Sequence, residues 1–260
     1  MAWSIMSENL NSIPQHCAVV VGVGASKGIG GAVCRRIAKE GLLVYIVGRT
    51  ASKLQLVADE ITATGGKVIV RTLDSTKPEQ VSALFQEITD KNQVIDLVVH
   101  NVGSNMPSRF LTTSPRFLEQ MWRATFFSGF LFGQASLAVF LAQQHGTLLF
   151  TGASGSMRGK PFFAAFTTGK SALRNYIQGI VREFNASNIH IAHIVIDGMV
   201  DGDRVNQFGY GLGRMIRLYR GGEKASLNVD DIADNYWQLH KQPKDLWTHE
   251  LDLRPFLEKF

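Results

Sequence analysis

Cysteine is scarce in this chain of 260 residues, which contains only Cys17 and Cys34. Two cysteines do not make a disulfide framework, and their spacing is not that of metal ligands. We therefore expect both to be small buried hydrophobic residues in a reducing compartment. The sequence also lacks proline- or serine-rich linkers, internal repeats and low-complexity tracts. This predicts one domain over residues 16–260, preceded by a short N-terminal extension over residues 1–15.

The opening sequence MAWSIMSENL lacks the basic flank and the long apolar core of a secretory signal. We therefore expect a cytoplasmic protein. The net charge of +5 comes from lysines and arginines that are mostly scattered among acidic residues. Such scattering is typical of a solvated surface, so we expect no nucleic-acid partner.

One apolar run, ATFFSGFLFGQASLAVFLA at residues 124–142, resembles a membrane span at first sight. It is at the short end for crossing a bilayer, contains Gln134 and has no basic flank at its C-terminal end. We interpret it as a helix that is apolar all round because it is buried against a sheet or a subunit partner, and we expect no membrane partner.

Short apolar runs alternate with longer segments of helical period along the chain. The expected strands are the runs at 18–23, 42–47, 67–72, 95–100, 146–151 and 189–196. The C-terminal stretch 247–260 adds a short alternating strand. Continuous rather than alternating hydrophobicity is typical of strands covered on both faces. The pattern predicts an α/β fold with a doubly wound parallel sheet of the Rossmann type, whose ligands bind at the carboxyl ends of the strands.

The loop after the first expected strand reads GVGASKGIGGAV, residues 22–33. Its glycines allow a tight turn and the close approach of a pyrophosphate to the N-terminus of the following helix. The second strand ends in IVGRT, so Gly48 stands where NAD sites usually carry an acidic residue, and Arg49 follows it. With Lys27, Arg49 could flank a 2′-phosphate, which favours NADP(H) over NAD(H); the alternative is that both cations are only solvated.

With these features the sequence resembles the short-chain dehydrogenase/reductase family over roughly residues 16–255. GASKGIG (24–30) is similar to the family's glycine motif, although Val23 replaces the usual threonine. Asp74 in TLDST resembles the aspartate that contacts the adenine, and HNVG (100–103) resembles the turn after the fourth strand. The resemblance implies these cofactor-binding residues: Gly24, Ser26, Lys27, Gly28, Ile29, Gly30, Arg49, Asp74, Ser75, Asn101, Gly103 and Lys170.

The catalytic half of the resemblance is incomplete. The family's tyrosine and lysine positions fall on Phe166 and Lys170, its serine position on Ala153, and its helix asparagine on Phe126. Where the family has a proline–glycine turn after the sixth strand, this sequence has Asp197-Gly198. Gly202 stands where the family has a threonine shortly afterwards. Only the lysine remains, and we interpret it as a ligand of the nicotinamide ribose. A phenylalanine has no proton to donate to a carbonyl substrate.

Other side chains could replace the lost proton donor. Ser154 lies beside Ala153, and His100 ends a strand near the expected cofactor. Histidine titrates in the right range, which makes His100 the better candidate acid, although a histidine that caps backbone groups is the more common case. GASGS (152–156) does not fit the nucleophile elbow of serine hydrolases. His190 and His193 are three apart on a strand and point to opposite faces, so we expect no metal site.

The region over residues 203–222 corresponds to the family's substrate lid. Its five glycines suggest a mobile segment, and Arg214, Arg217 and Arg220 recur every three residues. They form either a solvated basic face or a site for an anionic substrate or partner. The resemblance also implies a homodimer or homotetramer.

Two hypotheses on function remain open at this point. One is an NADP(H)-dependent oxidoreductase with an atypical active site, which acts on a small carbonyl or alcohol substrate. The other is a non-catalytic nucleotide-binding protein that acts as a sensor, a scaffold or a partner subunit.

Overall fold

A parallel sheet forms the centre of the molecule in the computed structural model, which describes residues 14–103, 105–184, 186–206, 212–219 and 221–258. The strand order is β3-β2-β1-β4-β5-β6-β9, and each neighbouring pair is parallel. The strands are β1 (His16–Val21), β2 (Leu43–Gly48), β3 (Val68–Thr72), β4 (Val94–His100), β5 (Gly146–Thr151), β6 (Ile189–Ile196) and β9 (Glu250–Leu253). A separate small sheet pairs β7 (Met199–Asp201) with β8 (Ser226–Asn228).

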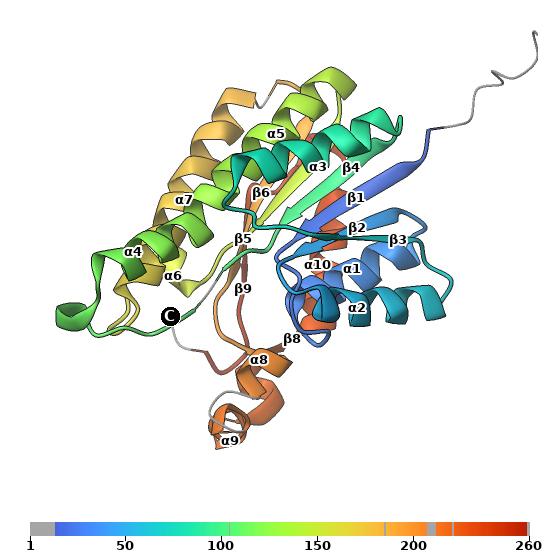
Figure 1. Cartoon of the computed structure of the whole chain (residues 1–260). Helices are drawn as coiled ribbons and strands as arrows, with labels where there is room; N and C mark the ends of the chain where they lie inside the picture. The colour runs from blue at the N-terminus through green and yellow to red at the C-terminus, as the bar shows by residue number, and fades with distance from the viewer. Residues whose placement is uncertain (1–13, 104, 185, 207–211, 220, 259–260) are drawn as a thin grey trace, which may run out of the picture.

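Helices cover both faces of the sheet, as Figure 1 shows. One face packs against α1 (Ile29–Lys39), α2 (Ala51–Ala63) and α10 (Val229–His240). The other face packs against α3 (Pro78–Asp90), α5 (Ser128–Gln143) and α7 (Ala164–Phe184). Shorter helices are η1 (Phe110–Thr112), α4 (Pro115–Trp122), α6 (Ser154–Met157), α8 (Asp203–Asn206), α9 (Leu212–Tyr219), η3 (Gly222–Ala225) and η4 (Lys244–Leu246).

The burial of the strands explains their continuous hydrophobicity. Every residue of β2 and β6 is buried, because helices cover both of their faces. The predicted fold class, a doubly wound Rossmann-type α/β domain, is therefore confirmed. Cys17 in β1 and Cys34 in α1 are free and buried, as expected for small hydrophobic residues.

The apolar run at 124–142 lies in one long helical segment. The π-helical turn η2 (Arg123–Phe127) joins α4 to α5 without a break, so the segment runs from Pro115 to Gln143. By length and composition alone it could cross a membrane, and half of its most apolar window is buried. In this structure α5 packs against β4, β5 and α3, which agrees with the interpretation as a helix that covers a sheet.

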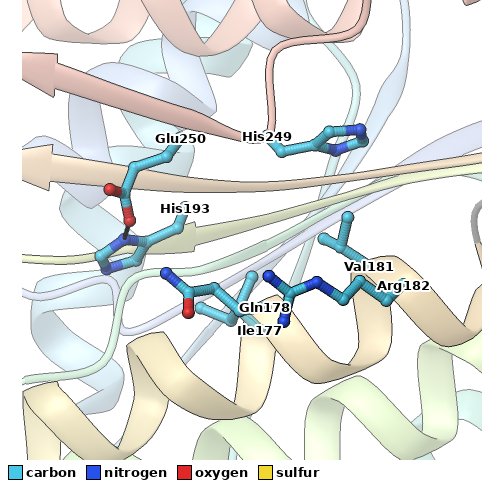
Figure 2. Close-up of a pocket in the computed structure, with 7 residues that line it drawn as sticks. All are labelled: Ile177, Gln178, Val181, Arg182, His193, His249 and Glu250. Carbon is cyan, nitrogen blue, oxygen red and sulfur yellow. Dashed lines mark hydrogen bonds and ion pairs between the residues drawn. The ribbon is translucent and has the colours of Figure 1, made fainter.

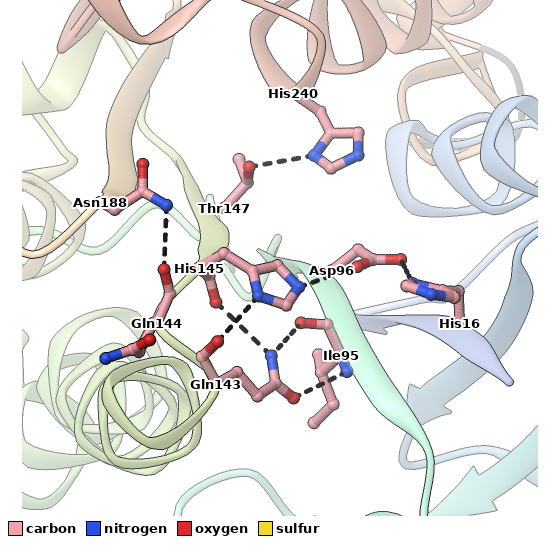
Figure 3. Close-up of polar contacts among 9 residues, drawn as sticks. All are labelled: His16, Ile95, Asp96, Gln143, Gln144, His145, Thr147, Asn188 and His240. Atoms are coloured by element: carbon pink, nitrogen blue, oxygen red, sulfur yellow. Dashed lines mark hydrogen bonds and ion pairs between the residues drawn. The ribbon is translucent and has the colours of Figure 1, made fainter. Parts of the chain in front are cut away.

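Polar side chains close the edge of the sheet at the amino ends of its strands (Figure 3). The Gln143 side-chain amide accepts a hydrogen bond from the Ile95 N–H at 3.0 Å and donates one to the Ile95 carbonyl at 2.9 Å. Asp96 pairs with His16 at 2.7 Å and with His145 at 3.4 Å. These contacts fix the end of α5 against β4, so the opposite edge, at the carboxyl ends, is left for a site.

The bounds of the first four strands differ from the sequence prediction by one or two residues, and the last strand is shorter than the stretch expected to contain it. The first strand, expected at 18–23, is His16–Val21, because the backbone leaves the sheet at Gly22 for the glycine-rich turn. The last strand covers only Glu250–Leu253 of the stretch 247–260. His190 and His193 point to opposite faces of β6, as predicted: His190 stacks on Trp247 with ring centroids 5.1 Å apart, and His193 contacts Glu250.

Candidate functional site

The glycine-rich turn and the end of β4 are in direct contact. Gly22 has a φ of +90°, and a Cβ at this position would lie 2.6 Å from the Asn101 carbonyl carbon, so only glycine fits. The Asn101 N–H donates to the Val21 carbonyl at 2.9 Å, and its side-chain Nδ2 donates to the Gly22 carbonyl at 3.2 Å. The structure therefore brings the predicted glycine loop and Asn101 together.

The same loop has open space at Gly24, where a Cβ would meet no heavy atom within 4 Å. Gly28 directly precedes α1, and no side chain caps the first turn of this helix. The backbone N–H groups of Ile29 and Gly30 thus begin a helix whose positive end is free to bind an anion. This combination of room and uncapped N–H groups fits a pyrophosphate.

A pair of charged residues holds the loop at Ser26. The Ser26 hydroxyl donates to Glu60 at 2.5 Å, and Arg35 donates to the Ser26 carbonyl at 3.1 Å and to Glu60 at 2.8 Å. The sequence indicated Ser26 as a cofactor ligand, whereas here its hydroxyl is directed to α2. Lys27 and Arg49 are both exposed. Lys27 also lines a cavity of about 350 Å³ beside the loop.

Asp74 follows β3 in a turn that its own side chain closes. Its Oδ1 accepts hydrogen bonds from the N–H and the hydroxyl of Thr76 at 2.9 and 2.8 Å. Burial raises the pKa of Asp74, but the Thr76 hydrogen bonds and the positive charges of Arg49 and Lys77 outweigh it, so the net pKa is lowered. The carboxylate stays ionised next to Arg49 and the buried Ser75, at the edge where an adenosine moiety is expected.

The hydroxyl groups of Thr151 and Tyr236 form a hydrogen-bonded chain that ends on the Asn101 side chain. The Thr151 hydroxyl donates to Asn101 Oδ1 at 2.9 Å, so the Tyr236 hydroxyl, 2.7 Å from Thr151 Oγ1, is the donor in the second bond. Tyr236 is fully buried in α10. Burial raises its pKa, against the smaller lowering effect of the Thr151 hydrogen bond. These two residues position Asn101, and the sequence analysis did not identify them.

Lys170 is buried at the centre of this edge. Its Nζ donates to the Thr151 carbonyl at 2.7 Å and to the Val102 carbonyl at 3.1 Å. A Cβ at Gly103 would lie 3.3 Å from the Lys170 Cε and Nζ, so a larger residue would displace the amine. Burial lowers the pKa of Lys170 to about 8. Lys170, Asn101 and Gly103, which were predicted to bind one cofactor, thus lie side by side.

Phe166 lies one helical turn before Lys170 on α7 and is also buried. Its ring carbon Cε1 would lie 3.2 Å from a Cβ at Gly155, in the loop that carries the family's serine position. At that position the Ala153 N–H donates to the Ser156 hydroxyl at 3.2 Å. Ser154 begins α6 and is partly exposed. An apolar ring therefore packs against this loop where a phenol is usual.

Phe126 lies in the π-helical turn η2 and not at a polar position. Its ring packs against Trp122 and Tyr176, with centroids 5.1 and 6.0 Å apart. Neighbouring Thr125 donates to the Met121 carbonyl at 2.6 Å. A phenylalanine here has no hydrogen-bonding group for a proton relay.

His100 is the last residue of β4, as the sequence predicted, but its side chain lies in the core and does not face the expected cofactor site. It is completely buried, its ring packs near Phe132 and Phe150, and Nε2 lies 2.9 Å from the Ser128 hydroxyl. The Ser128 hydroxyl donates to the Ala124 carbonyl, so the imidazole is the donor to Ser128. Burial, with a smaller effect of Lys170, lowers the pKa of His100 to about 3. This neutral, buried ring argues against the role of substitute acid.

A buried carboxylate marks the end of β6. Asp197 is 1% exposed and accepts hydrogen bonds from Arg158 at 3.0 and 2.8 Å; Arg254 lies 3.0 Å away. The Asp197 hydrogen bond raises the pKa of Arg158. This contact ties the loop after Ala153 to the C-terminal segment. The unusual Asp197, which stands where the family has proline, was the only sequence signal for it.

The segment expected as a lid begins on the glycine loop. The Asp203 N–H donates to the Lys27 carbonyl at 2.9 Å, and a Cβ at Gly202 would lie 2.7 Å from the same oxygen. Of residues 203–222, the structure describes α8, α9 and 221–222, whereas 207–211 and Arg220 lie outside the described residues. Arg214 is exposed. A role for these arginines in anion binding stays a prediction.

A second cavity, of about 420 Å³, lies away from these residues, between α7 and β9 (Figure 2). His193 and Glu250 meet there, with Nδ1 3.0 Å from the carboxylate. Glu250 also accepts two hydrogen bonds of 2.7 Å from Arg174. Burial lowers the pKa of His193 to about 4, although Glu250 opposes this. Among the described residues, no group of three or more histidine, cysteine or acidic side chains could hold a metal ion.

Comparison with known proteins identifies this architecture. The family model described as short chain dehydrogenase matches residues 18–209. The NADPH-dependent 1-acyldihydroxyacetone phosphate reductase of Saccharomyces cerevisiae is 29% identical over 196 residues. That match covers 75% of this chain and 64% of the yeast protein, so the chain spans less than two thirds of this relative.

Solved structures show the same fold. A short-chain dehydrogenase from Rhodopseudomonas palustris is 32% identical, with a TM-score of 0.77, and the match covers 92% of this chain and 98% of that one. A metagenomic short-chain oxidoreductase in complex with NADP is 21% identical, with a TM-score of 0.77 and coverages of 93% and 96%. The second likeness shows the fold alone. With the glycine loop, Asn101 and Lys170 assembled at the carboxyl ends of β1, β4 and β5, these matches establish that the chain belongs to the short-chain dehydrogenase family.

Proposed function

We propose that this protein is an NADP(H)-dependent oxidoreductase with an atypical active site, which acts on a carbonyl or alcohol substrate. The observation that carries the proposal is the position of Lys170, buried between the Val102 and Thr151 carbonyls and against Gly103. Burying an amine lowers the stability of the fold, and binding of a ligand by that amine would offset this loss. Nothing in this arrangement requires a tyrosine, because a lysine can hold ribose hydroxyls by itself.

The residues present fit a dinucleotide. The uncapped start of α1 and the open side of Gly24 would take the pyrophosphate. Lys27 and Arg49 are exposed cations suited to a 2′-phosphate, and Gly48 leaves no carboxylate to bond a free ribose hydroxyl. When bound, the nicotinamide would supply or accept hydride. The names of the yeast NADPH-dependent relative and the NADP-bound neighbour support this choice of cofactor.

The protein's own contribution to proton transfer is reduced. Phe166 has no acidic proton, and Ala153 has no hydroxyl to orient a carbonyl oxygen. Lys170, with a pKa of about 8, is mostly protonated near neutral pH, but both of its hydrogen bonds in this structure go to backbone carbonyls. We therefore propose that water, the substrate itself or the nearby Ser154 hydroxyl delivers the proton.

A specific observation also favours the second hypothesis, a non-catalytic nucleotide-binding protein. Phe166 packs against the loop at Gly155 and so places an apolar ring where a carbonyl is normally polarised. A sensor, scaffold or partner subunit would need the cofactor-binding residues and not the tyrosine. The two hypotheses share the cofactor site and differ only in turnover.

The remaining proposals concern partners and place. We propose a small-molecule substrate, and an anionic molecule is one candidate. Arg214 is exposed on helix α9 of the expected lid, and the yeast relative is named for a phosphate ester. By family resemblance we propose a homodimer or homotetramer. We propose a cytoplasmic location, which suits two free cysteines.

Cofactor titration tests the proposal. We expect saturable binding of NADPH, followed by fluorescence, with weaker binding of NADH. The double variant Lys27→Gln/Arg49→Gln should lose the preference, because the 2′-phosphate would lose both cations, while NADH affinity stays the same. Lys170→Ala should weaken both cofactors. Absence of saturable binding, or a preference for NADH, would contradict the cofactor assignment. Steady NADPH oxidation with a panel of carbonyl compounds would support the oxidoreductase, and binding without oxidation would support the non-catalytic nucleotide-binding protein.

A further inference from the structure

Four exposed apolar side chains lie in the two loops that lead into the site. Phe110 is 81% exposed, Leu111 94%, Phe162 60% and Met106 47%. We call Met106, Phe110, Leu111 and Phe162 the apolar rim. The first three belong to the segment between β4 and α4, and Phe162 lies between Ala153 and Phe166. Large apolar side chains that gather on a surface usually mark an interaction site.

Backbone contacts hold the apolar rim in a defined shape. The Ser108 N–H donates to the Phe162 carbonyl at 2.7 Å, which joins the two loops. Phe162 itself has a φ of +66°, in the left-handed region that a phenylalanine rarely adopts. Thr113 Oγ1 donates to the Arg109 carbonyl at 2.8 Å and closes the turn that presents Phe110. The backbone at Phe162 is therefore strained, while its phenyl ring remains exposed to solvent.

Exposed cations lie in the same stretches of sequence as the apolar rim. Arg109, Arg116 and Lys160 are all exposed. The segments 105–118 and 153–168 contain no aspartate or glutamate, and the exposed Glu119 is the first acidic residue after the first of them. A surface that is apolar at its boundary and carries negative charge would complement these side chains.

The apolar rim projects from the end of the molecule where the site lies. Figure 1 shows η1 and α4 at the carboxyl-end edge of the sheet, beyond β4 and β5, on the same side as α6. The two cavities of about 420 and 350 Å³ are lined by other residues. Phe110 and Leu111 stand out into solvent at the tip of a turn, so they fit insertion into a soft surface better than the lining of a groove.

We propose that the apolar rim docks this protein on the surface of a membrane that contains anionic lipid. Apolar tips would enter the boundary between headgroups and acyl chains, and the exposed cations would face the lipid phosphates and carboxylates. Docking in this way differs from the sequence expectation of no membrane partner, but it involves no spanning helix. It would place the mouth of the site against the bilayer. The proposal stands independently of the cofactor and of turnover.

Vesicle sedimentation tests the proposal with the full chain. We expect the protein to sediment with vesicles of phosphatidylcholine mixed with phosphatidylserine, and at least tenfold less with phosphatidylcholine alone or in high salt. Phe110→Ser/Leu111→Ser should lower binding to the mixed vesicles by at least tenfold, and Arg109→Gln/Lys160→Gln should do so by several-fold. These side chains are exposed, so the thermal unfolding midpoint should not change.

A matched control separates the apolar rim from general hydrophobicity. Leu246 is 72% exposed on η4 and Leu56 is 58% exposed on α2, both outside the apolar rim. Leu246→Ser and Leu56→Ser should leave vesicle binding unchanged. Three results would overturn the proposal: no sedimentation with mixed vesicles, equal loss in the control variants, or a Phe110→Ser/Leu111→Ser variant that binds like the wild type. Dissociation of an oligomer by this variant, without any vesicle binding, would assign the apolar rim to a protein contact.

Discussion

At the residue scale, Phe166 and Ala153 limit the proton transfer that the protein's own side chains can supply. Both lie at the positions where the family has a proton donor and its hydroxyl partner, and Phe166 packs against the same loop at Gly155. A general acid contributes roughly 10²–10⁴-fold to a rate. The wild-type protein should therefore bind NADPH and reduce ordinary aldehydes and ketones at rates barely above background.

Restoring both groups tests this account. We expect Phe166→Tyr/Ala153→Ser to raise NADPH oxidation with a carbonyl panel by on the order of 10²-fold, because a phenol beside the Lys170 ammonium has a lowered pKa. Cofactor affinity should stay the same. Phe166→Leu is the matched control, since it changes the ring without adding a hydroxyl group. Robust wild-type turnover that none of these variants alters would place the chemistry elsewhere.

The residues that the sequence could and could not identify differ in one physical respect. Lys170, Asn101 and Gly103 were implied by resemblance to short family motifs, which are local in sequence. Parallel strands bring the carboxyl ends that carry such motifs to one edge. Thr151 and Tyr236 are 85 residues apart and meet only through the packing of α10 on the sheet. The neutral state of His100 also depends on burial, which no local pattern shows.

At the element scale, the close approach of α7 to the π-helical turn η2 positions Lys170. Gly169 lies against Thr125, and a Cβ at Gly169 would be 1.7 Å from the Thr125 hydroxyl oxygen. That hydroxyl is already committed to the Met121 carbonyl. A side chain at Gly169 would therefore push α7 away from η2 and move the next residue, Lys170, with it.

Two glycines of the same helix give a matched pair of variants. Gly169→Ala should destabilise the protein by about 1–3 kcal/mol, because the added methyl group overpacks the contact with Thr125. Gly179 is exposed, and a Cβ there would meet no atom within 4 Å. Gly179→Ala should stabilise the protein by about 0.5–1 kcal/mol through helix propensity. Urea unfolding measures both; shifts of the same sign would contradict the packing described for η2.

The elements themselves were predictable to different degrees. Strands such as Gly146–Thr151 and Ile189–Ile196 agree with their expected bounds, because strands buried on both faces are continuously apolar. The π-helical turn was not predictable, because the run at 124–142 has the same composition in an α- or a π-helical backbone. The length of the last strand depends on its register with β6, a tertiary contact.

At the scale of the whole molecule, the two edges of the sheet have different roles. Gln143 and Asp96 close the amino-end edge with side-chain hydrogen bonds (Figure 3). The carboxyl-end edge carries glycine turns, the buried Lys170 and the apolar rim. The buried amine of Lys170 and the positive φ of Phe162 both cost stability, and both lie at the edge where a ligand would bind.

Buried imidazoles add a cost that concerns the entire fold. Burial lowers the pKa of His100 to about 3 and the pKa values of His193 and His240 to about 4, from an ordinary value of 6.5. Glu250 faces His193 and opposes its shift, and Asp96 does the same for His240. Between the two pKa values, each of these imidazoles is protonated in the unfolded chain and neutral in the folded protein. Between pH 6.5 and about 4, the free energy of unfolding must therefore fall as the pH falls.

The slope of that fall is the measurable quantity. Each imidazole that is protonated only in the unfolded chain contributes up to about 1.4 kcal/mol per pH unit. Urea unfolding between pH 7 and pH 4.5 should therefore show a steep loss of stability below pH 6.5. His240→Asn keeps a polar group beside Thr147, whose hydroxyl lies 3.0 Å from His240 Nδ1, but does not titrate. This variant should lose one imidazole's share of the slope. A free energy of unfolding that stays flat from pH 6.5 to 4.5 would mean that these rings accept protons in the folded protein.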